Sequence, residues 1–210
     1  MSAILLSAAT ALGGCTQGEF LSWDPDTPAE KTMREKSEAL QSTVGEGAVT
    51  GIALGAVLGG LIGGGAGAFR GAEIGRLLGA GAGTYVRGLQ EQYATREEVL
   101  AAVARDIDAT NLALESTIAD MRRVLAERRA ALAAARAAGR EEIARARSRR
   151  ALAEMNGAIK SAEQREAFFG EARTLLVADA SAPPVDPYLA GLSARIAAMR
   201  TIADKLAKEL

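Results

Sequence analysis

The chain has 210 residues and a formal net charge of −1, and it contains only one Trp, three Tyr and four Phe. A globular core normally depends on large side chains for its buried area, so the many Ala and Gly residues favour helices packed at close range. The single cysteine excludes an internal disulfide, and the absence of histidine removes the commonest general base and leaves little for a zinc site. We therefore expect neither an enzyme nor a bound cofactor or metal.

A short apolar run, residues 3–12, fits the core of a secretory signal because it is too short to span a bilayer. It leads into the sequence LGGC, which ends at Cys15 and resembles the lipobox of bacterial lipoproteins. The resemblance implies a signal peptide over residues 1–14, cleavage before Cys15, and lipidation of that cysteine, with palmitate among the acyl chains. Several acyl chains together give stable membrane anchoring.

The residue after the cysteine is Thr16, whereas the inner-membrane retention signal of such lipoproteins is an aspartate. The resemblance therefore implies the bacterial outer membrane. The alternative reading is an uncleaved apolar N-terminus with an incidental buried cysteine, since no Lys or Arg precedes Lys31.

The segment 15–46 is expected to be a tether with one short helix. Residues 22–29 are polar and contain two prolines. Thr27 is suited to cap a helix that Pro28 opens at its first position, and this helix is expected to contain residues 31–40.

A glycine occurs at every fourth position over a long segment, with Leu, Ile and Val between the glycines. Flexible linkers interleave polar residues instead, and a soluble helix loses about 1 kcal/mol for each glycine relative to alanine. In lipid, the backbone must satisfy its own hydrogen bonds, and small residues allow two helices to approach closely. The pattern therefore predicts helix packing in a membrane through Gly47, Gly51, Gly55, Gly59, Gly63, Gly67, Gly71, Gly75, Gly79 and Gly83.

The period of four also predicts a break within this zipper. Each step of four residues drifts by about 40° around a helix, so ten glycines cannot form one straight seam. We expect a helical hairpin over residues 47–88, with a first arm at 47–65, a turn at 66–72 and a second arm at 73–88.

The stretches GAVLGGLIGGGAGA and GRLLGAGAG, residues 55–68 and 75–83, are similar to the glycine-zipper domain of bacterial envelope proteins, which include small surface-antigen lipoproteins. The resemblance implies packing in a lipid membrane, with self-association or another envelope protein as partner. Tyr85 follows the last glycine and is expected to anchor at the membrane interface.

The remainder, residues 95–210, shows apolar residues at spacings of three and four, which predicts an all-α coiled-coil or bundle domain. Helices are expected at 95–139, 140–177 and 188–210, and Thr95 forms a capping box with Glu98.

Two features of this domain stay open in the sequence. Gly139 either kinks one long helix or turns it back into a hairpin. An intramolecular bundle of three helices and an oligomeric coiled coil both fit the pattern.

Ten arginines and only three glutamates lie between residues 122 and 150. Nucleic acid is not expected as a partner, because no aromatic residue is interleaved for base stacking. The pattern is typical of a solvated helical face, and the sharper hypothesis is contact with an anionic envelope polymer or headgroup. The residues proposed for this contact are Arg122, Arg123, Arg128, Arg129, Arg145, Arg147, Arg149 and Arg150.

These patterns together predict an envelope lipoprotein with a structural, scaffold or assembly role. It would be anchored in the outer membrane, and its helical domain would lie in the periplasm or at the surface. The alternative function is an oligomeric membrane pore or transport accessory formed by assembled zipper hairpins.

Overall fold

The computed structural model describes residues 27–45, 81–177 and 184–210. These residues form five helices and no strand, so the predicted all-α class is confirmed. The helices are α1 (Pro28–Gly45), α3 (Ala82–Gln92), α4 (Arg96–Ala137), α5 (Glu141–Leu176) and α6 (Asp186–Ala207).

The longest helix, α4, begins at the predicted capping box. The Thr95 side chain accepts a hydrogen bond from the backbone N–H of Glu98, and the Glu98 side chain accepts one from the backbone N–H of Thr95. This reciprocal pair satisfies two N–H groups that have no partner within the helix. The 42 residues of α4 span about 63 Å at 1.5 Å per residue.

A tight turn at Gly139 reverses the chain between α4 and α5. Gly139 has a φ of +63°, in the left-handed region that glycine adopts without steric cost, and such a residue commonly ends a helix. The two helices then run antiparallel and pack against each other. Of the two readings that the sequence left open at Gly139, the structure has the turn.

The last helix, α6, returns along α4 in the parallel direction. Arg173 at the end of α5 forms an ion pair with Asp186 at the start of α6, at 2.6 Å. Farther along, the Asn111 side chain donates to the carbonyl of Tyr188, and Arg129 pairs with Glu209 near the end of α6. The helix begins two residues before the expected Tyr188, because Pro187 is accepted in the first turn.

The apolar core runs along the contacts between α4, α5 and α6. Every apolar residue that the spacing marked on α4 is buried, and Met155 and Phe169 of α5 and Leu192 and Met199 of α6 are fully buried. The marked residues of α4 are Leu100, Val103, Ile107, Leu114, Ile118, Met121, Leu125 and Leu132.

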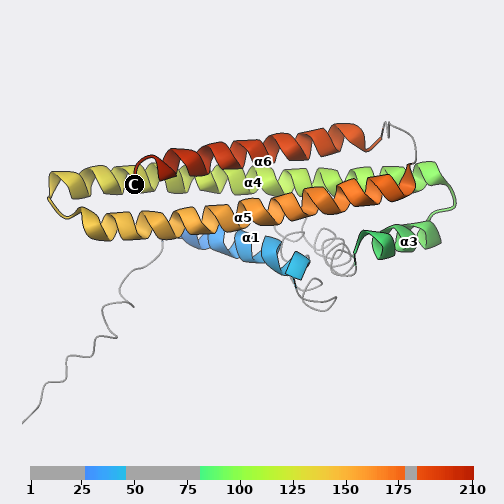
Figure 1. The fold of residues 1–210 in the computed structure, drawn as a ribbon, viewed down its shortest axis with the longest axis horizontal. Helices are drawn as coiled ribbons and strands as arrows, with labels where there is room; N and C mark the ends of the chain where they lie inside the picture. Colours follow the sequence, from blue (N-terminus) through green and yellow to red (C-terminus); the bar gives the residue numbers. More distant parts are fainter. Residues whose placement is uncertain (1–26, 46–80, 178–183) are drawn as a thin grey trace, which may run out of the picture.

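Two shorter helices cover the opposite side of the α4–α5 hairpin from α6. Both α1 and α3 pack on α4 and α5, and Figure 1 shows them below the hairpin while α6 lies above it. The zipper segment lies in the sequence between α1 and α3. The two helices that flank the zipper therefore pack on the same face of the bundle. We call this side the α1/α3 face.

The helix α1 is longer and more firmly packed than a tether with a short helix. It starts at Pro28, as predicted, and Thr27 and Glu30 form a second capping box, with bonds of 3.2 and 3.1 Å. Ala29 and Met33 are buried in the common core. Residues 27–36 are therefore part of the bundle.

Candidate functional site

The predicted lipidation site and most of the zipper are outside the described residues. Cys15 and the nine glycines from Gly47 to Gly79 fall there, as do the first arm and the turn of the expected hairpin. Among residues 27–45, 81–177 and 184–210, no helix has the length and apolar character that crossing a membrane requires.

The end of the expected second arm differs from its prediction. We expected one helix over residues 73–88, but α3 begins only at Ala82 and extends to Gln92. Gly81 precedes it with a φ of +86°, which interrupts any helix at that point. The last residues of the expected arm instead belong to a separate helix of the bundle.

Gly83 is the one predicted packing glycine that the structure describes. It lies on the exposed face of α3, and a Cβ added there would meet no atom within 4 Å. Gly83 therefore makes no close helix contact within the described part of the chain.

Tyr85 is buried rather than placed at a membrane interface, contrary to our expectation. Its ring lies 5.3 Å from that of Phe168 and 6.2 Å from that of Phe169, measured between centroids, and it is fully buried. Its hydroxyl donates to the Asp106 carboxylate at 2.7 Å. Burial and the nearby negative charge of Asp106 raise the pKa of Tyr85 well above its ordinary value. The aromatic anchor thus fastens α3 to α4 and α5.

Within the described side chains of α1, residues 28–36, ion pairs make contacts to α4. Glu30 and Arg128, which are 8% and 6% exposed, form an ion pair of 2.7 Å between α1 and α4. Lys36 pairs with Asp120 and donates to Ser116 at 2.7 Å. A charge taken out of water is costly unless it is paired, so these contacts fix where α1 sits along α4.

Two weaker polar contacts lie at the edges of α1. The Thr27 hydroxyl donates to Glu127 at 2.6 Å, and Arg34 lies 3.8 Å from Glu154 of α5. The order of the contacts shows that α1 runs antiparallel to α4. Its end at Gly45, nine residues beyond Lys36, therefore points toward α3.

No local pattern in the sequence identifies the partners of Glu30 and Lys36. Glu30 and Arg128 are 98 residues apart, and Lys36 and Asp120 are 84 apart. The spacing of Thr27 and Glu30 is a capping box, and together with Pro28 at the first helical position it is a local sign of the helix start.

Arg128 has to be removed from the residues proposed for contact with an anionic surface. Its side chain is buried, and its guanidinium is paired with the Glu30 carboxylate. A lipid or polymer phosphate cannot reach its guanidinium without displacing α1.

The other seven arginines of that proposal divide by their partners. Arg123 pairs with Asp120 at 3.4 Å, Arg129 pairs with Glu209 at 3.0 Å, and Arg145 pairs with Glu141 at 2.7 Å. Arg147 is half-buried and has an interaction of its own. The exposed side chains that form no ion pair with any described residue are Arg122, Arg149 and Arg150.

The turn between α4 and α5 projects beyond the other helices. Arg149 and Arg150 lie about three helical turns from it on α5, whereas Arg122 lies more than four turns away from it on α4. Figure 1 shows this hairpin end extending past the C-terminus of α6. Ile143, in the first turn of α5, is 64% exposed and is the most exposed large apolar side chain among the described residues. The hairpin end of α5 thus combines arginines with a largely exposed apolar side chain.

Comparison with known protein families gives a match over the N-terminal part of the chain. No curated protein and no solved structure matches the sequence. The match ends at residue 87, inside α3. Residues 1–87 match the model of the YMGG-like Gly-zipper family, which supports the glycine zipper and suggests a membrane-associated protein.

Proposed function

We propose that this protein is an envelope lipoprotein that inserts its zipper as a helical hairpin and uses its helical bundle as a scaffold or assembly partner. Lipid on Cys15 and the zipper hold it at the outer membrane. The zipper match over residues 1–87 supports the membrane association, and the LGGC sequence supports the lipid anchor.

The observation that carries the proposal is the common core of α1 and α3. Met33 of α1, before the zipper, and Tyr85 of α3, after it, belong to one apolar cluster. A single packed bundle cannot lie on both sides of a bilayer, so Gly45 and Gly81 are on the same side. A zipper inserted between them crosses an even number of times or re-enters, which favours the hairpin over a single span.

The chemistry of the bundle favours a scaffold over an enzyme. Several of its buried polar residues make contacts between helices, as Glu30 and Arg128 do, and these residues organise the fold. The long surfaces of α4 and α5 are suited to present side chains to another envelope protein or to a second copy of the chain.

Fatty-acid labelling in a bacterial host tests the anchor. We expect a radiolabelled palmitate to be incorporated into the full chain and lost in Cys15→Ala, while the matched variant Thr16→Ser keeps it. Incorporation that survives Cys15→Ala contradicts lipidation at this residue.

Thiol accessibility tests the arrangement of the zipper. In a Cys15→Ser background, Lys31→Cys on α1 and Glu91→Cys on α3 place single thiols at exposed positions on either side of the zipper. A membrane-impermeant maleimide on sealed proteoliposomes is expected to label both positions in equal proportion. Labelling at one position with protection at the other contradicts the hairpin.

A further inference from the structure

We propose that the helical bundle lies along the membrane on its α1/α3 face, and that a stripe of side chains at the hairpin end of α5 binds the acidic headgroups of the same bilayer. The stripe consists of Ile143, Arg147 and Arg150, with Arg140 at the N-cap of the helix. The inference rests on the proposed function, because the zipper has to insert for this face to be the one nearest the bilayer.

One side of α5 faces the two helices that flank the zipper. Glu154 lies next to Arg34 of α1, and Phe168 lies against Tyr85 of α3, so both residues point toward the α1/α3 face. Residues advance by about 100° around a helix, and Glu154 and Phe168, fourteen positions apart, therefore differ by about 40° in direction. One side of α5 thus meets both flanking helices.

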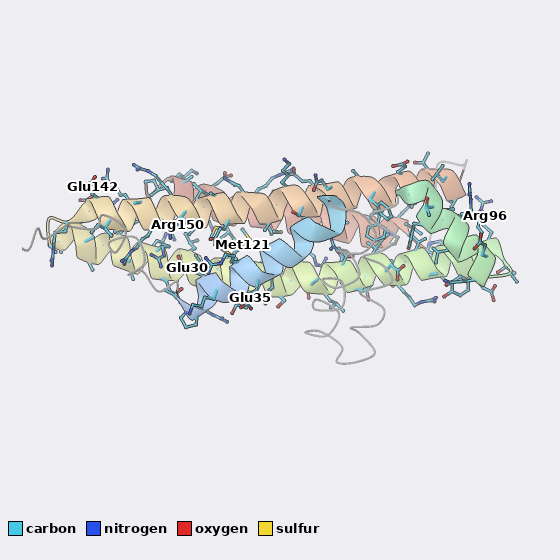
Figure 2. All side chains as sticks on the ribbon, turned by 90° about the horizontal axis from the view of Figure 1, so that it is seen from below. Glu30, Glu35, Arg96, Met121, Glu142 and Arg150 are labelled. Atoms are coloured by element: carbon cyan, nitrogen blue, oxygen red, sulfur yellow. The ribbon has the colours of Figure 1, made fainter. Side chains whose placement is uncertain are left out.

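The same arithmetic places the stripe on that side. Ile143, Arg147 and Arg150 lie within about 40° of the direction of Glu154. Arg145 and Arg149 lie about 180° and 140° away from it. Only part of the arginine cluster therefore faces the side from which the zipper leaves and re-enters the bundle. Figure 2 looks onto this face, with α1 and α3 in front of the hairpin and Arg150 toward the hairpin end.

The stripe combines exposed arginines with an exposed apolar residue. Arg140 and Arg150 are exposed and form no ion pair with any described residue, and Ile143 is 64% exposed between them. Glu141 and Glu142 lie about 140° and 120° from the direction of Glu154 and point away from the stripe. Glu154 itself lies on the same side, four residues after Arg150, and is paired with Arg34 of α1. Arginine side chains flanking an exposed apolar residue fit a surface that offers phosphates above a hydrocarbon layer.

The stripe lies on the same face of the bundle as the two ends of the zipper. The α1 helix ends at Gly45 while pointing toward α3, and α3 starts after Gly81, so both ends of the zipper leave from the α1/α3 face. When the zipper is inserted, the acidic headgroups are the first anions that this face meets. Zipper and stripe are separated along the bundle, and contact at both places holds the bundle parallel to the membrane.

Depth-dependent quenching on vesicles tests the inference with the full chain. In the Cys15→Ser background, a fluorophore is attached either at Ile143→Cys or at Ala194→Cys, an exposed position of α6. Vesicles contain phosphatidylcholine with or without phosphatidylglycerol, and a nitroxide lipid quenches at headgroup depth. We expect quenching at position 143 on acidic vesicles, reversal by added salt, and no quenching at position 194.

Arginine variants supply the matched control. Arg140→Gln and Arg150→Gln are each expected to lower the ratio of docked to undocked bundle about fivefold, because one basic residue near an acidic surface contributes that much. Arg149→Gln removes the same charge one position away, on another side of α5, and is expected to change nothing.

Three results would overturn the inference: equal quenching at positions 143 and 194, quenching that does not depend on phosphatidylglycerol, or an equal effect of Arg149→Gln and Arg150→Gln. Flotation with the vesicles separates these outcomes from failure of the proposed function. A chain that does not float refutes membrane insertion, whereas a chain that floats without quenching at position 143 refutes only the docking.

Discussion

The two helices that flank the zipper are held on the same face of the bundle by different chemistry. The α3 helix buries Ala82, Tyr85, Val86 and Leu89, and its tyrosine packs on two phenylalanines of α5. The α1 helix buries Ala29 and Met33 but depends on the ion pairs of Glu30 and Lys36.

The difference lies in how each contact responds to its surroundings. Burial of apolar and aromatic surface is non-directional and tolerates small shifts between the helices. A buried ion pair fixes one register and becomes strongly destabilising when one partner is removed. The attachment of α1 is therefore more specific in its register, and the attachment of α3 tolerates small shifts better. Substitutions in each contact test this difference.

The largest effect is expected from the aromatic attachment. Phe169→Ala should lower the free energy of unfolding by about 3–5 kcal/mol, because it leaves a cavity where a fully buried ring met Tyr85 and Phe168. Urea denaturation measures the loss, and hydrogen exchange should rise more over α3 than over α1. Leu175→Ala on the same helix, at a side chain that is 53% exposed, should stay within about 0.5 kcal/mol of the wild type. Equal loosening of α1 and α3 would refute the division between them.

The polar attachment is tested next. Arg128→Met should cost about 3 kcal/mol, because it leaves the Glu30 carboxylate buried without its partner. Hydrogen exchange should then rise over α1 and remain unchanged over α3. Adding Glu30→Met to this variant should restore most of the stability, since an apolar pair of similar volume carries no desolvation penalty.

A surface pair is the control for this experiment. Arg129→Met removes a partner of Glu209 at a pair whose side chains are 46% and 31% exposed, and it should cost less than about 1 kcal/mol. If Arg128→Met is no worse than Arg129→Met, then α1 is not held by its buried pair.

A smaller effect is expected at the start of α1. Thr27→Ala removes the capping hydroxyl and its bond to Glu127, and it should cost about 1–2 kcal/mol. Circular dichroism during urea denaturation measures the stability, and exchange should increase first in α1. Thr32→Ala, which removes only a bond to the carbonyl of Pro28 within the helix, should leave stability unchanged. Identical losses in the two variants would exclude a capping role for Thr27.

The smallest effect is expected from the polar tip of the aromatic anchor. Tyr85→Phe keeps the ring and loses the bond to Asp106, so it should cost about 1 kcal/mol. Tyr93→Phe is the matched control, because the Tyr93 hydroxyl accepts only an exposed bond of 3.3 Å from Arg105. A loss at Tyr85 as large as that of Phe169→Ala would mean that α3 too depends on a polar contact.

The sequence by itself determined the long helices and the start of α4. Apolar spacing marked the buried side of α4, and Thr95 with Glu98 marked its first residue, because helical periodicity and capping are local properties of the chain. The period-four glycine pattern of the zipper is also a local property of the sequence, and the family match over residues 1–87 supports it. Lipidation of Cys15 is predicted from the short LGGC motif and stays a prediction.

Only the tertiary structure decided what the ends of the zipper and the arginine cluster do. The sequence pattern predicts Tyr85 at a membrane interface, because no local pattern shows that Phe168 and Phe169 lie against it from α5. Arg128 falls between Leu125 and Leu132 on the apolar side of α4, but its partner Glu30 is 98 residues away, and only the structure shows the pair in the core. Packing between distant segments sets burial, and burial determines whether an aromatic ring or a charge belongs to the core or to a surface.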